Sequence, residues 1–437
     1  MIRIAQSRTR RGERGITVAF VAVSIFALVG MAALAIDLVT LYVAKSQAQR
    51  VADAGALAGA KTLVERGITA DPLNTQGSWA ASCVQATAQA RNIANRGRIG
   101  GVAPLSVTPQ FCSGGACGAG CPAPGGVGTG FGVNPQVQVA VQSVPLPLFF
   151  AKIWGSGTAT VRATGYAEGF NPSSTNVPVA AKCVTPWLLP NLDPATGVSI
   201  FNEGNGNLAN NQPSTPGNTQ GLVGRGIQLA TGCPGGCSVT MNNPVSGVGP
   251  PFTLDYYPLD LPNPAASGPS CSVGTTYQQN ITACNPTPLA CGQTVDLDLS
   301  AGPANVGNNQ VAIDCLIGAA AAGPGNGQDT INAASFPFQI NAGSNHNGVA
   351  VGTQVTTSRS VVTIPVYHSV PGAPPATTAV EVIGFVQAFV DSVNPVTLEP
   401  TIYILNVSSC SASARASGGP AVGLGEGSPV PVRLIHP

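Results

Sequence analysis

The sequence predicts an α+β protein: a long N-terminal helix, first transmembrane and then extracytoplasmic, packs on a small antiparallel sheet and is followed by a β-rich, disulfide-bonded domain. Three observations predict this fold class. A run of 21 residues, Ile16–Ile36, carries no charge. All 12 cysteines follow that run. Segments that alternate apolar with polar or small residues, as half-buried strands do, recur through the rest of the chain.

The apolar run is long enough to cross a membrane. At about 1.5 Å per residue, a helix over this run matches the roughly 30 Å of hydrocarbon in a bilayer. A cleaved secretory signal is the alternative, but its apolar region has only about 7 to 15 residues. Five arginines and one glutamate precede the run, so the N-terminus is expected to stay in the cytoplasm. The predicted membrane anchor residues are Ile16, Phe20, Ile25, Phe26, Leu28, Leu34 and Ile36.

The helical pattern continues beyond the span, because no proline interrupts it before Gly67. We therefore expect one helix over residues 15–66. In its outer half, small side chains recur at helical spacing, which permits close approach of a sheet or another helix. These positions are Ala44, Ala48, Val51, Gly55 and Ala58.

Two acidic residues on this helix are candidates for contacts. Asp37 stands at the outer end of the span, where it is expected to mark the membrane interface or to pair with a basic residue of a partner. Asp53 is expected to bond locally to Gln49 or Arg50, or to meet another subunit. The full set of candidate helix or partner contacts is Asp37, Tyr42, Asp53, Gly55 and Gly59.

After the first helix the sequence predicts a small α/β unit. A second helix is expected over residues 78–95, followed by strands at 105–111, 136–144 and 158–170. The apolar segment at 145–155 is expected to be a short helix or a loop. A sheet of these strands backed by the outer half of the first helix would bury both apolar faces.

The second half of the chain is predicted to be mostly β structure, punctuated by Gly, Pro and Asn. Its expected strands are 295–299, 360–366, 380–390, 401–406 and 430–435. The predicted organisation is a basic cytoplasmic tail (1–14), a transmembrane helix (15–43), an extracytoplasmic α/β module (44–170), a linker (171–178) and a β-rich disulfide-bonded domain (179–437).

The cysteines predict disulfides in an oxidising compartment, because all of them lie on the exported side and their number is even. They are Cys83, Cys112, Cys117, Cys121, Cys183, Cys233, Cys237, Cys271, Cys284, Cys291, Cys315 and Cys410. Zinc is the alternative for the CxxxC pairs Cys117/Cys121 and Cys233/Cys237, but the repeated CxxC and nearby histidines that structural zinc sites favour are absent from the sequence. Both pairs are instead interpreted as glycine turns closed by a bridge.

Charge excludes one class of partner. The chain has 19 Lys+Arg and 18 Asp+Glu, together 8% of its residues, against about 25% in an ordinary soluble domain. No basic block follows the first fourteen residues, so nucleic-acid binding is not expected. No cofactor is predicted.

Residues suited to catalysis or metal binding are few. The histidines are His346, His368 and His436, and His368 with Asp391 and a serine is the formal basis for an anchored hydrolase. No GxSxG elbow singles out a serine. The Asp296/Asp298 pair has the spacing of a cation site on a strand, but a solvated strand face is the preferred interpretation.

One stretch carries a family resemblance. Arg10–Leu63 contains a basic RxGxxG start, an apolar span closed by Ala-Ile-Asp-Leu at 35–38, Leu-Tyr at 41–42, and Ala-Asp-Ala-Gly-Ala-Leu-Ala-Gly-Ala at 52–60. In this combination the chain resembles the TadE/TadG-like proteins of tight-adherence (Flp) pilus assembly, and 44–170 would then be a pilin-like module. The resemblance implies a membrane-anchored, exported structural component, TadG-like in its N-terminal region, that works by helix packing and protein contacts and is not an enzyme.

The same resemblance implies partners and a location. The expected partners are membrane lipid, other pilus-assembly or secretion-system proteins and further copies of the chain. The expected location is the inner membrane, with the C-terminal bulk in the periplasm or at the cell surface. The chain departs from pseudopilins, since position five after Gly15 is Phe20 where a glutamate would be needed, so processing at Gly15 is not carried over. An anchored adhesin or surface-interaction protein is the alternative function.

Overall fold

The structure is a computed structural model. It describes residues 11–64, 79–113, 115–122, 134–151, 157–170, 179–206, 208–209, 221–234, 236–238, 241, 245–247, 252–264, 273–300, 306–319, 327–334, 338–355, 357–369, 373–394, 396–417, 422–423, 430 and 432–435. The predicted linker at 171–178 lies outside these residues.

The chain divides into two compact units. The first contains Met1–Gly55, Arg91–Thr108 and Val139–Gly165, and the second contains Ala56–Ala90, Pro109–Gln138 and Tyr166–Pro437. Several helices and strands run from one unit into the other, so these units do not follow the boundaries predicted from sequence. Those boundaries remain a prediction.

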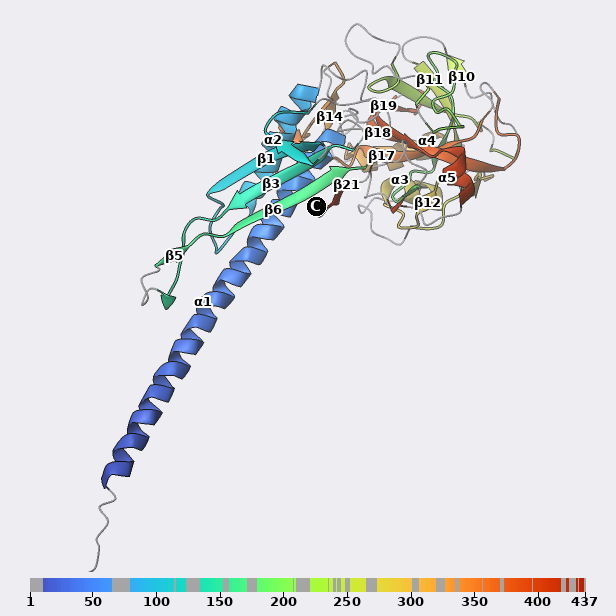
Figure 1. Cartoon of the computed structure of the whole chain (residues 1–437). Coiled ribbons are helices and arrows are strands. Elements are labelled where there is room, and N and C mark those ends of the chain that lie inside the picture. Colours follow the sequence, from blue (N-terminus) through green and yellow to red (C-terminus); the bar gives the residue numbers. More distant parts are fainter. Residues whose placement is uncertain are drawn as a thin grey trace, which may run out of the picture. The chain divides into compact units, whose positions relative to one another are not determined.

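Helix α1 (Arg11–Val64) is one uninterrupted helix, as predicted (Figure 1). Its N-terminal part is long and apolar enough to cross a membrane, with the candidate span starting at Ile16. The helix ends close to the predicted position, before Gly67. Helix α2 (Trp79–Arg96) also agrees with the sequence-based expectation.

A five-stranded sheet follows, with strand order β2-β1-β3-β6-β21. Its strands are β1 (Ser106–Ser113), β2 (Ala116–Gly118), β3 (Gln136–Gln142), β6 (Arg162–Gly169) and β21 (Val432–Leu434). Strand β21 pairs antiparallel with β6, with Arg433 opposite Glu168. The C-terminal strand was predicted from sequence, but its place beside β6 was not.

The apolar segment between β3 and β6 is a hairpin, where the sequence predicted a short helix or a loop. Strands β4 (Leu146–Pro147) and β5 (Thr158–Ala159) pair antiparallel. The single strand predicted at 158–170 is therefore two strands, β5 and β6, interrupted at Thr160 and Val161. The interruption lets β5 turn away from the sheet to pair with β4.

Small residues let α1 approach the strands closely. In the first unit, a Cβ added at Gly165 of β6 would lie 2.6 Å from the backbone of Ala52 and Asp53 on α1. In the second unit, a Cβ added at Gly59 of α1 would lie 2.9 Å from a methyl group of Val137 on β3. The predicted packing of the outer half of α1 on the small sheet is confirmed.

The β-rich part forms a larger sheet of eight strands, in the order β10-β11-β8-β17-β18-β19-β9, with β13 paired to β18. Strand β9 also pairs in parallel with β11, so the strands from β11 to β9 form a closed hydrogen-bonded ring. These strands are β8 (Trp187–Pro190), β9 (Gly226–Thr231), β10 (Val245–Gly247), β11 (Phe252–Pro258), β13 (Thr294–Asp296), β17 (Val361–Tyr367), β18 (Ala379–Val393) and β19 (Pro400–Ser409).

Two smaller sheets and three helices complete this part. The sheets have the orders β12-β7-β20 and β14-β15-β16. Their strands are β7 (Val179–Ala181), β12 (Leu289–Ala290), β14 (Thr330–Asn332), β15 (Gln339–Asn341), β16 (Gln354–Val355) and β20 (Val422–Gly423). The helices are α3 (Thr276–Thr282), α4 (Val306–Ile317) and α5 (Ala412–Ser417).

The main core lies between the larger sheet and helices α3 and α4. Trp187, Ile364 and Val386 are fully buried there and share one apolar cluster with Tyr277 of α3 and Ile313 of α4. Helix α3 begins with a capping box, in which the Thr275 hydroxyl accepts the Gln278 N–H. A large apolar cluster of this kind is what stabilises a β-rich domain with few charges.

Five disulfides join described cysteines, which confirms the disulfide-bonded fold. They are Cys83–Cys121, Cys112–Cys117, Cys183–Cys284, Cys233–Cys237 and Cys291–Cys410. Cys315 is also disulfide-bonded, and Cys271 lies outside the described residues. Each of the five joins two cysteines on the same side of residues 171–178.

One predicted bridge is wrong. Cys117 and Cys121 do not close a glycine turn, because Cys117 bonds to Cys112 and Cys121 to Cys83. The cause is the β1–β2 hairpin, whose antiparallel register places Cys112 directly opposite Cys117. The corresponding bridge between Cys233 and Cys237 is present.

The close approach at Gly165 predicts a specific loss of stability. Gly165→Ala is expected to lower the free energy of unfolding by about 1–3 kcal/mol, because the new methyl group meets rigid helix backbone. Urea unfolding of the purified chain in detergent measures it. Gly157→Ala is the matched control, since its Cβ would meet nothing within 4 Å. An unchanged Gly165→Ala variant would contradict the packing described here.

Candidate functional site

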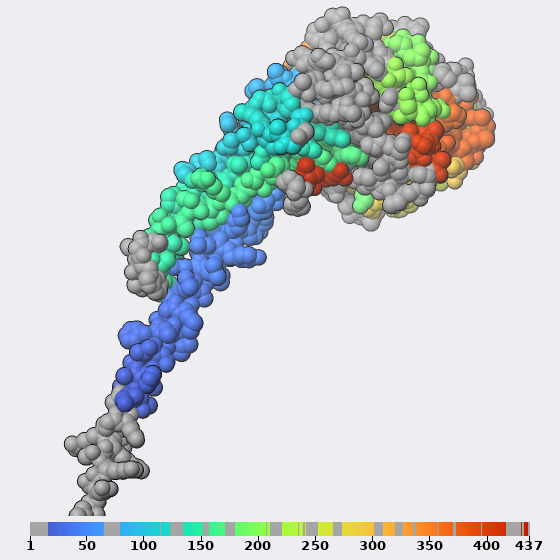
Figure 2. Space-filling model, viewed as in Figure 1, coloured from blue at the N-terminus to red at the C-terminus, as the bar shows by residue number. Residues whose placement is uncertain are grey.

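The predicted anchor residues form an exposed apolar surface on the N-terminal part of α1, which is the dark blue part of the chain in Figure 2. Their exposed fractions range from 51% at Ile36 to 79% at Phe26. The surface continues past Asp37, since Leu38, Val39 and Val43 are also exposed. A helix that is apolar all round belongs inside a protein core or in lipid. No described residue covers these side chains, so lipid is the environment that suits them.

Asp37 interrupts this apolar surface, but its carboxylate is buried, with 3% of the residue exposed. Its oxygens accept three main-chain N–H bonds from consecutive residues: 3.0 Å from Phe149, 3.0 Å from Phe150 and 2.7 Å from Ala151. A carboxylate only accepts hydrogen bonds, and three N–H donors replace much of the water it gives up on burial. We call this arrangement the Asp37 clasp.

The clasp changes the interpretation of Asp37. The sequence left two roles for it, marking the membrane interface or pairing with a basic residue of a partner. In the structure its acceptors are used within its own chain, by the hairpin that follows β4. A carboxylate satisfied in this way does not need bulk water, so Asp37 need not stand at the water boundary.

The hairpin reaches Asp37 because β4 and β5 extend the chain along α1. Leu146 of β4 is buried and packs over Gly100, where an added Cβ would lie 2.6 Å from its Cδ2. The Leu148 N–H donates to the Gly157 carbonyl, which closes the hairpin beyond β4. Ala33, one turn before Asp37, is also buried, so the covered strip of α1 begins there.

The other candidate contacts of α1 have different surroundings. Tyr42 is 76% exposed. Asp53 accepts a 2.8 Å bond from the Gln49 side chain, which is the local alternative that the sequence predicted. Gly55 and Gly59 are buried within the chain. Tyr42 is therefore the one of these five whose side chain is open to a partner.

Lys45, one turn beyond Tyr42, and Gln49 tie α1 to β6. The Lys45 ammonium donates to the Arg162 carbonyl, and the Gln49 amide donates to the Thr164 carbonyl at 2.9 Å. Together with the Asp37 clasp, these bonds attach residues 149–151 and 162–164 to α1 at three positions along the helix, Asp37, Lys45 and Gln49. Neither Lys45 nor Gln49 was predicted from the sequence to attach α1 to the sheet.

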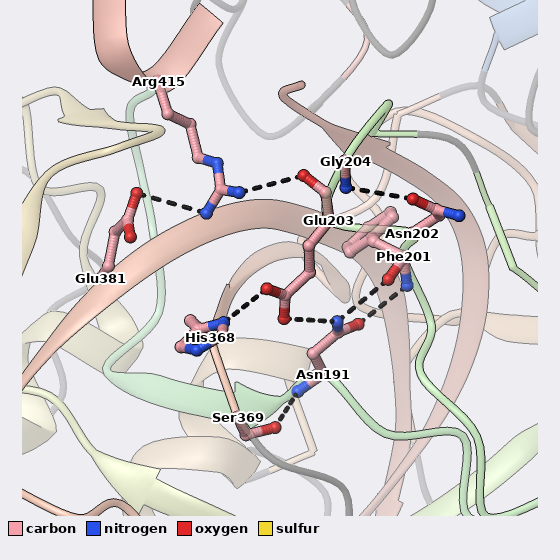
Figure 3. Close-up of polar contacts among 9 residues, drawn as sticks. All are labelled: Asn191, Phe201, Asn202, Glu203, Gly204, His368, Ser369, Glu381 and Arg415. Carbon is pink, nitrogen blue, oxygen red and sulfur yellow. Dashed lines mark hydrogen bonds and ion pairs between the residues drawn. The ribbon is translucent and has the colours of Figure 1, made fainter. Parts of the chain in front are cut away.

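His368 lies in a polar network of the β-rich part (Figure 3). Its Nδ1 is 2.6 Å from a carboxylate oxygen of Glu203, while the other Glu203 oxygen accepts from the Asn191 amide at 3.3 Å. The Ser369 hydroxyl accepts the Asn191 N–H at 3.0 Å. Arg415 donates to the Glu203 carbonyl and to Glu381. The network joins the ends of β8, β17 and α5.

This network differs from the formal triad in the sequence. The acid beside His368 is Glu203, whereas Asp391 accepts a bond from Ser392 and burial raises the pKa of the Asp391 carboxyl. The pairing of His368 with Asp391 is therefore wrong, because the long β18 strand places Asp391 far along from the end of β17. Nucleophile activation requires a hydroxyl bonded to the base, whereas the bond of the His368 ring goes to the Glu203 carboxylate and the Ser369 hydroxyl accepts the Asn191 N–H.

A second histidine, His346, also has an acidic partner. His346 Nδ1 is 3.2 Å from both oxygens of Asp329, and the Ser358 hydroxyl donates to Asp329 at 2.6 Å. The serine thus bonds to the acid and not to the imidazole, which is the wrong order for general-base activation. The cluster binds the β14–β15 region to the residues before β17.

Metal binding finds little support in the described ranges. No group of three or more His, Cys, Asp or Glu side chains that could hold an ion occurs among these residues. Asp296 is exposed on β13 while Val295 and Leu297 are buried. Asp298 accepts the Ser300 N–H at 2.9 Å. This alternation has the geometry of a solvated strand face. His436 lies outside the described residues.

Sequence reasoning missed the partners that complete these arrangements. Glu203 and Asp329 carry no local motif, because each meets its histidine across long chain separations. The amides of 149–151 are main-chain groups, which no residue type reports. A usable signal was the apolar stretch at 145–155, whose exposure to water would be unfavourable.

The Asp37 clasp predicts slow amide exchange at 149–151. Asp37→Ala removes the acceptors, so exchange at Phe149, Phe150 and Ala151 is expected to become faster, with Asp37→Asn intermediate because one carbonyl acceptor remains. Hydrogen exchange with mass spectrometry on the full chain in nanodiscs measures it. Asp53→Asn is the control and should leave these amides unchanged. Equal exchange in Asp37→Ala and the unmodified chain would refute the clasp.

One part of the chain matches a known protein family. The family described as "Putative Flp pilus-assembly TadE/G-like" matches residues 15–62. No curated protein and no solved structure matches the chain. The match spans the exposed apolar surface, Asp37 and the buried small-residue face of α1. The chain therefore carries, at residues 15–62, a TadE/G-like Flp pilus-assembly segment on a helix long and apolar enough to span a membrane, as expected of an anchored, pilus-associated component.

Proposed function

We propose that the chain is a TadG-like structural component of Flp-type pilus assembly. A single pass of α1 holds it in the inner membrane, with the arginine-rich N-terminus in the cytoplasm and the disulfide-bonded bulk outside. The observation that carries this proposal is the exposed apolar surface from Ile16 to Val43, which lies inside the matched family segment.

The component works by contact and not by catalysis. In the described part of the chain, the small-residue face of α1 is covered by the chain's own strands, so it is not free for another subunit. Contacts in the membrane therefore fall to the apolar faces around Phe26, and contacts at its outer surface fall to side chains such as Tyr42. Other pilus-assembly or secretion-system proteins, and further copies of the chain, are the partners.

The two histidine clusters support the same conclusion. In each, the imidazole Nδ1 faces a carboxylate and the nearest bonded serine hydroxyl is engaged elsewhere in the cluster. Such networks join strands and loops that are distant in sequence. A structural role accounts for the bonds that are present.

Association with pilus components tests the proposal. Tagged full-length chain, crosslinked in its native host under piliating conditions, is expected to co-purify with pilus-assembly or secretion-system proteins. Phe26→Arg should reduce this capture, because a charge at the centre of a membrane helix costs about 2.5–3.5 kcal/mol. Phe26→Leu is the matched control and should retain it. Failure of the unmodified chain to capture any such protein would contradict the proposal.

Catalysis is tested separately at His368. His368→Ala removes the imidazole from a half-exposed position and is expected to leave pilus number, counted by electron microscopy, unchanged. Asn191→Ala serves as the comparison, because this fully buried side-chain amide donates to the Phe201 carbonyl and accepts the Phe201 N–H, and its loss should reduce folded protein. Loss of pili in His368→Ala with normal protein levels would favour an enzyme. Normal pili with lost surface attachment would favour an adhesin.

A further inference from the structure

We propose that the β4–β5 hairpin is a second membrane contact, in which Phe149 lies in the outer leaflet beside the anchor helix. The inference rests on the proposed function, because it requires α1 to span a bilayer. It adds a lipid-binding surface that belongs to the exported part of the chain.

The Asp37 clasp sets the position of the hairpin along the membrane helix. The Asp37 clasp fixes the amides of 149–151 level with Asp37 on α1. Asp37 is 21 residues beyond Ile16, which places it roughly 30 Å along the helix at about 1.5 Å per residue. That distance equals the approximate hydrocarbon thickness of a bilayer. Residues 149–151 therefore lie at the outer edge of the hydrocarbon and not in the water above it.

The surface level with Asp37 is apolar and exposed. Phe149 is 64% exposed although its own N–H is fixed to Asp37, so its ring is presented outward. Leu38 and Val39 are exposed on the next turn of α1. Aromatic side chains are favoured at the membrane interface, and exposed apolar patches in water are unfavourable. The exposed surface of the hairpin thus continues the lipid-facing surface of the helix.

A groove lies just beyond Asp37 on the outer side. It is lined on α1 by Leu38, Leu41 and Lys45 and on the strand side by Val161 and Arg162. Lys45 lies eight residues beyond Asp37, or about 12 Å farther out along the helix, which is just outside a headgroup layer of roughly 5–8 Å. An apolar groove with two exposed cationic side chains at its outer end suits a position beside lipid, because Lys and Arg near the membrane are attracted to its anionic headgroups.

A second copy of the chain or a partner protein could also cover an apolar hairpin. Lipid is favoured because the hairpin is continuous with the predicted span and is held at bilayer height by a bond to that span. A protein partner on this surface would have to displace lipid from the side of the helix as well.

Photocrosslinking of the full chain distinguishes these occupants. Phe149→p-benzoylphenylalanine keeps an aromatic ring at an exposed position. The variant is reconstituted in vesicles of phosphatidylcholine and phosphatidylglycerol, irradiated, and its peptides analysed by mass spectrometry. The same replacement at Phe20 is the positive control within the span, and at Val396, which is 87% exposed in the β-rich part, it is the negative control.

The expected result is a phospholipid adduct at position 149 comparable in yield to that at position 20, with none at position 396. An adduct to protein alone at 149, or no adduct there, with lipid at 20, overturns the hairpin inference and leaves the anchor intact. Absence of lipid at 20 instead contradicts the span and the proposed function. Equal lipid yields at 149 and 396 would mean non-specific labelling and would also overturn the inference.

Discussion

The carboxylate of Asp37 and the three amides that bind it set the arrangement of the membrane-proximal part of the chain. An acidic side chain one helix turn from exposed leucine and valine must be solvated by something. Here the solvating groups are main-chain N–H donors of 149–151, so one interaction both makes the carboxylate compatible with apolar surroundings and fixes the hairpin to α1. Asp37 also lies within residues 15–62, which match the TadE/G-like family model.

Farther along α1, steric fit replaces charge as the organising constraint. Alanines and glycines leave so little volume that strand β6 lies against helix backbone at Gly165, and β3 lies against Gly59. The end of α1 is then attached to the larger sheet, since the Asn406 amide donates to the Val64 carbonyl at 2.8 Å. The small-residue face in the outer half of α1 is therefore covered by strands of its own chain.

Periodicity predicted the elements better than it predicted their neighbours. α1, α2, β1 and β3 follow from helical or alternating patterns with local causes. The return of β21 to β6 and the bridge from Cys112 to Cys117 depend on register and on contacts distant in sequence, which no local pattern encodes. The same holds for the candidate site. Asp37 was identifiable as a charge next to an apolar run, whereas its partners are backbone amides that every residue but proline possesses, and Glu203 reaches His368 only through tertiary folding.

We propose that α1 is integrated in a lipid bilayer as a permanent anchor. Alkaline carbonate extraction of membranes from the native host tests it most directly, because high pH strips proteins held by surface charge and leaves those whose apolar helix is inserted in lipid. The full-length chain should remain in the membrane pellet and enter solution only with detergent. Quantitative release into the carbonate supernatant would contradict the account.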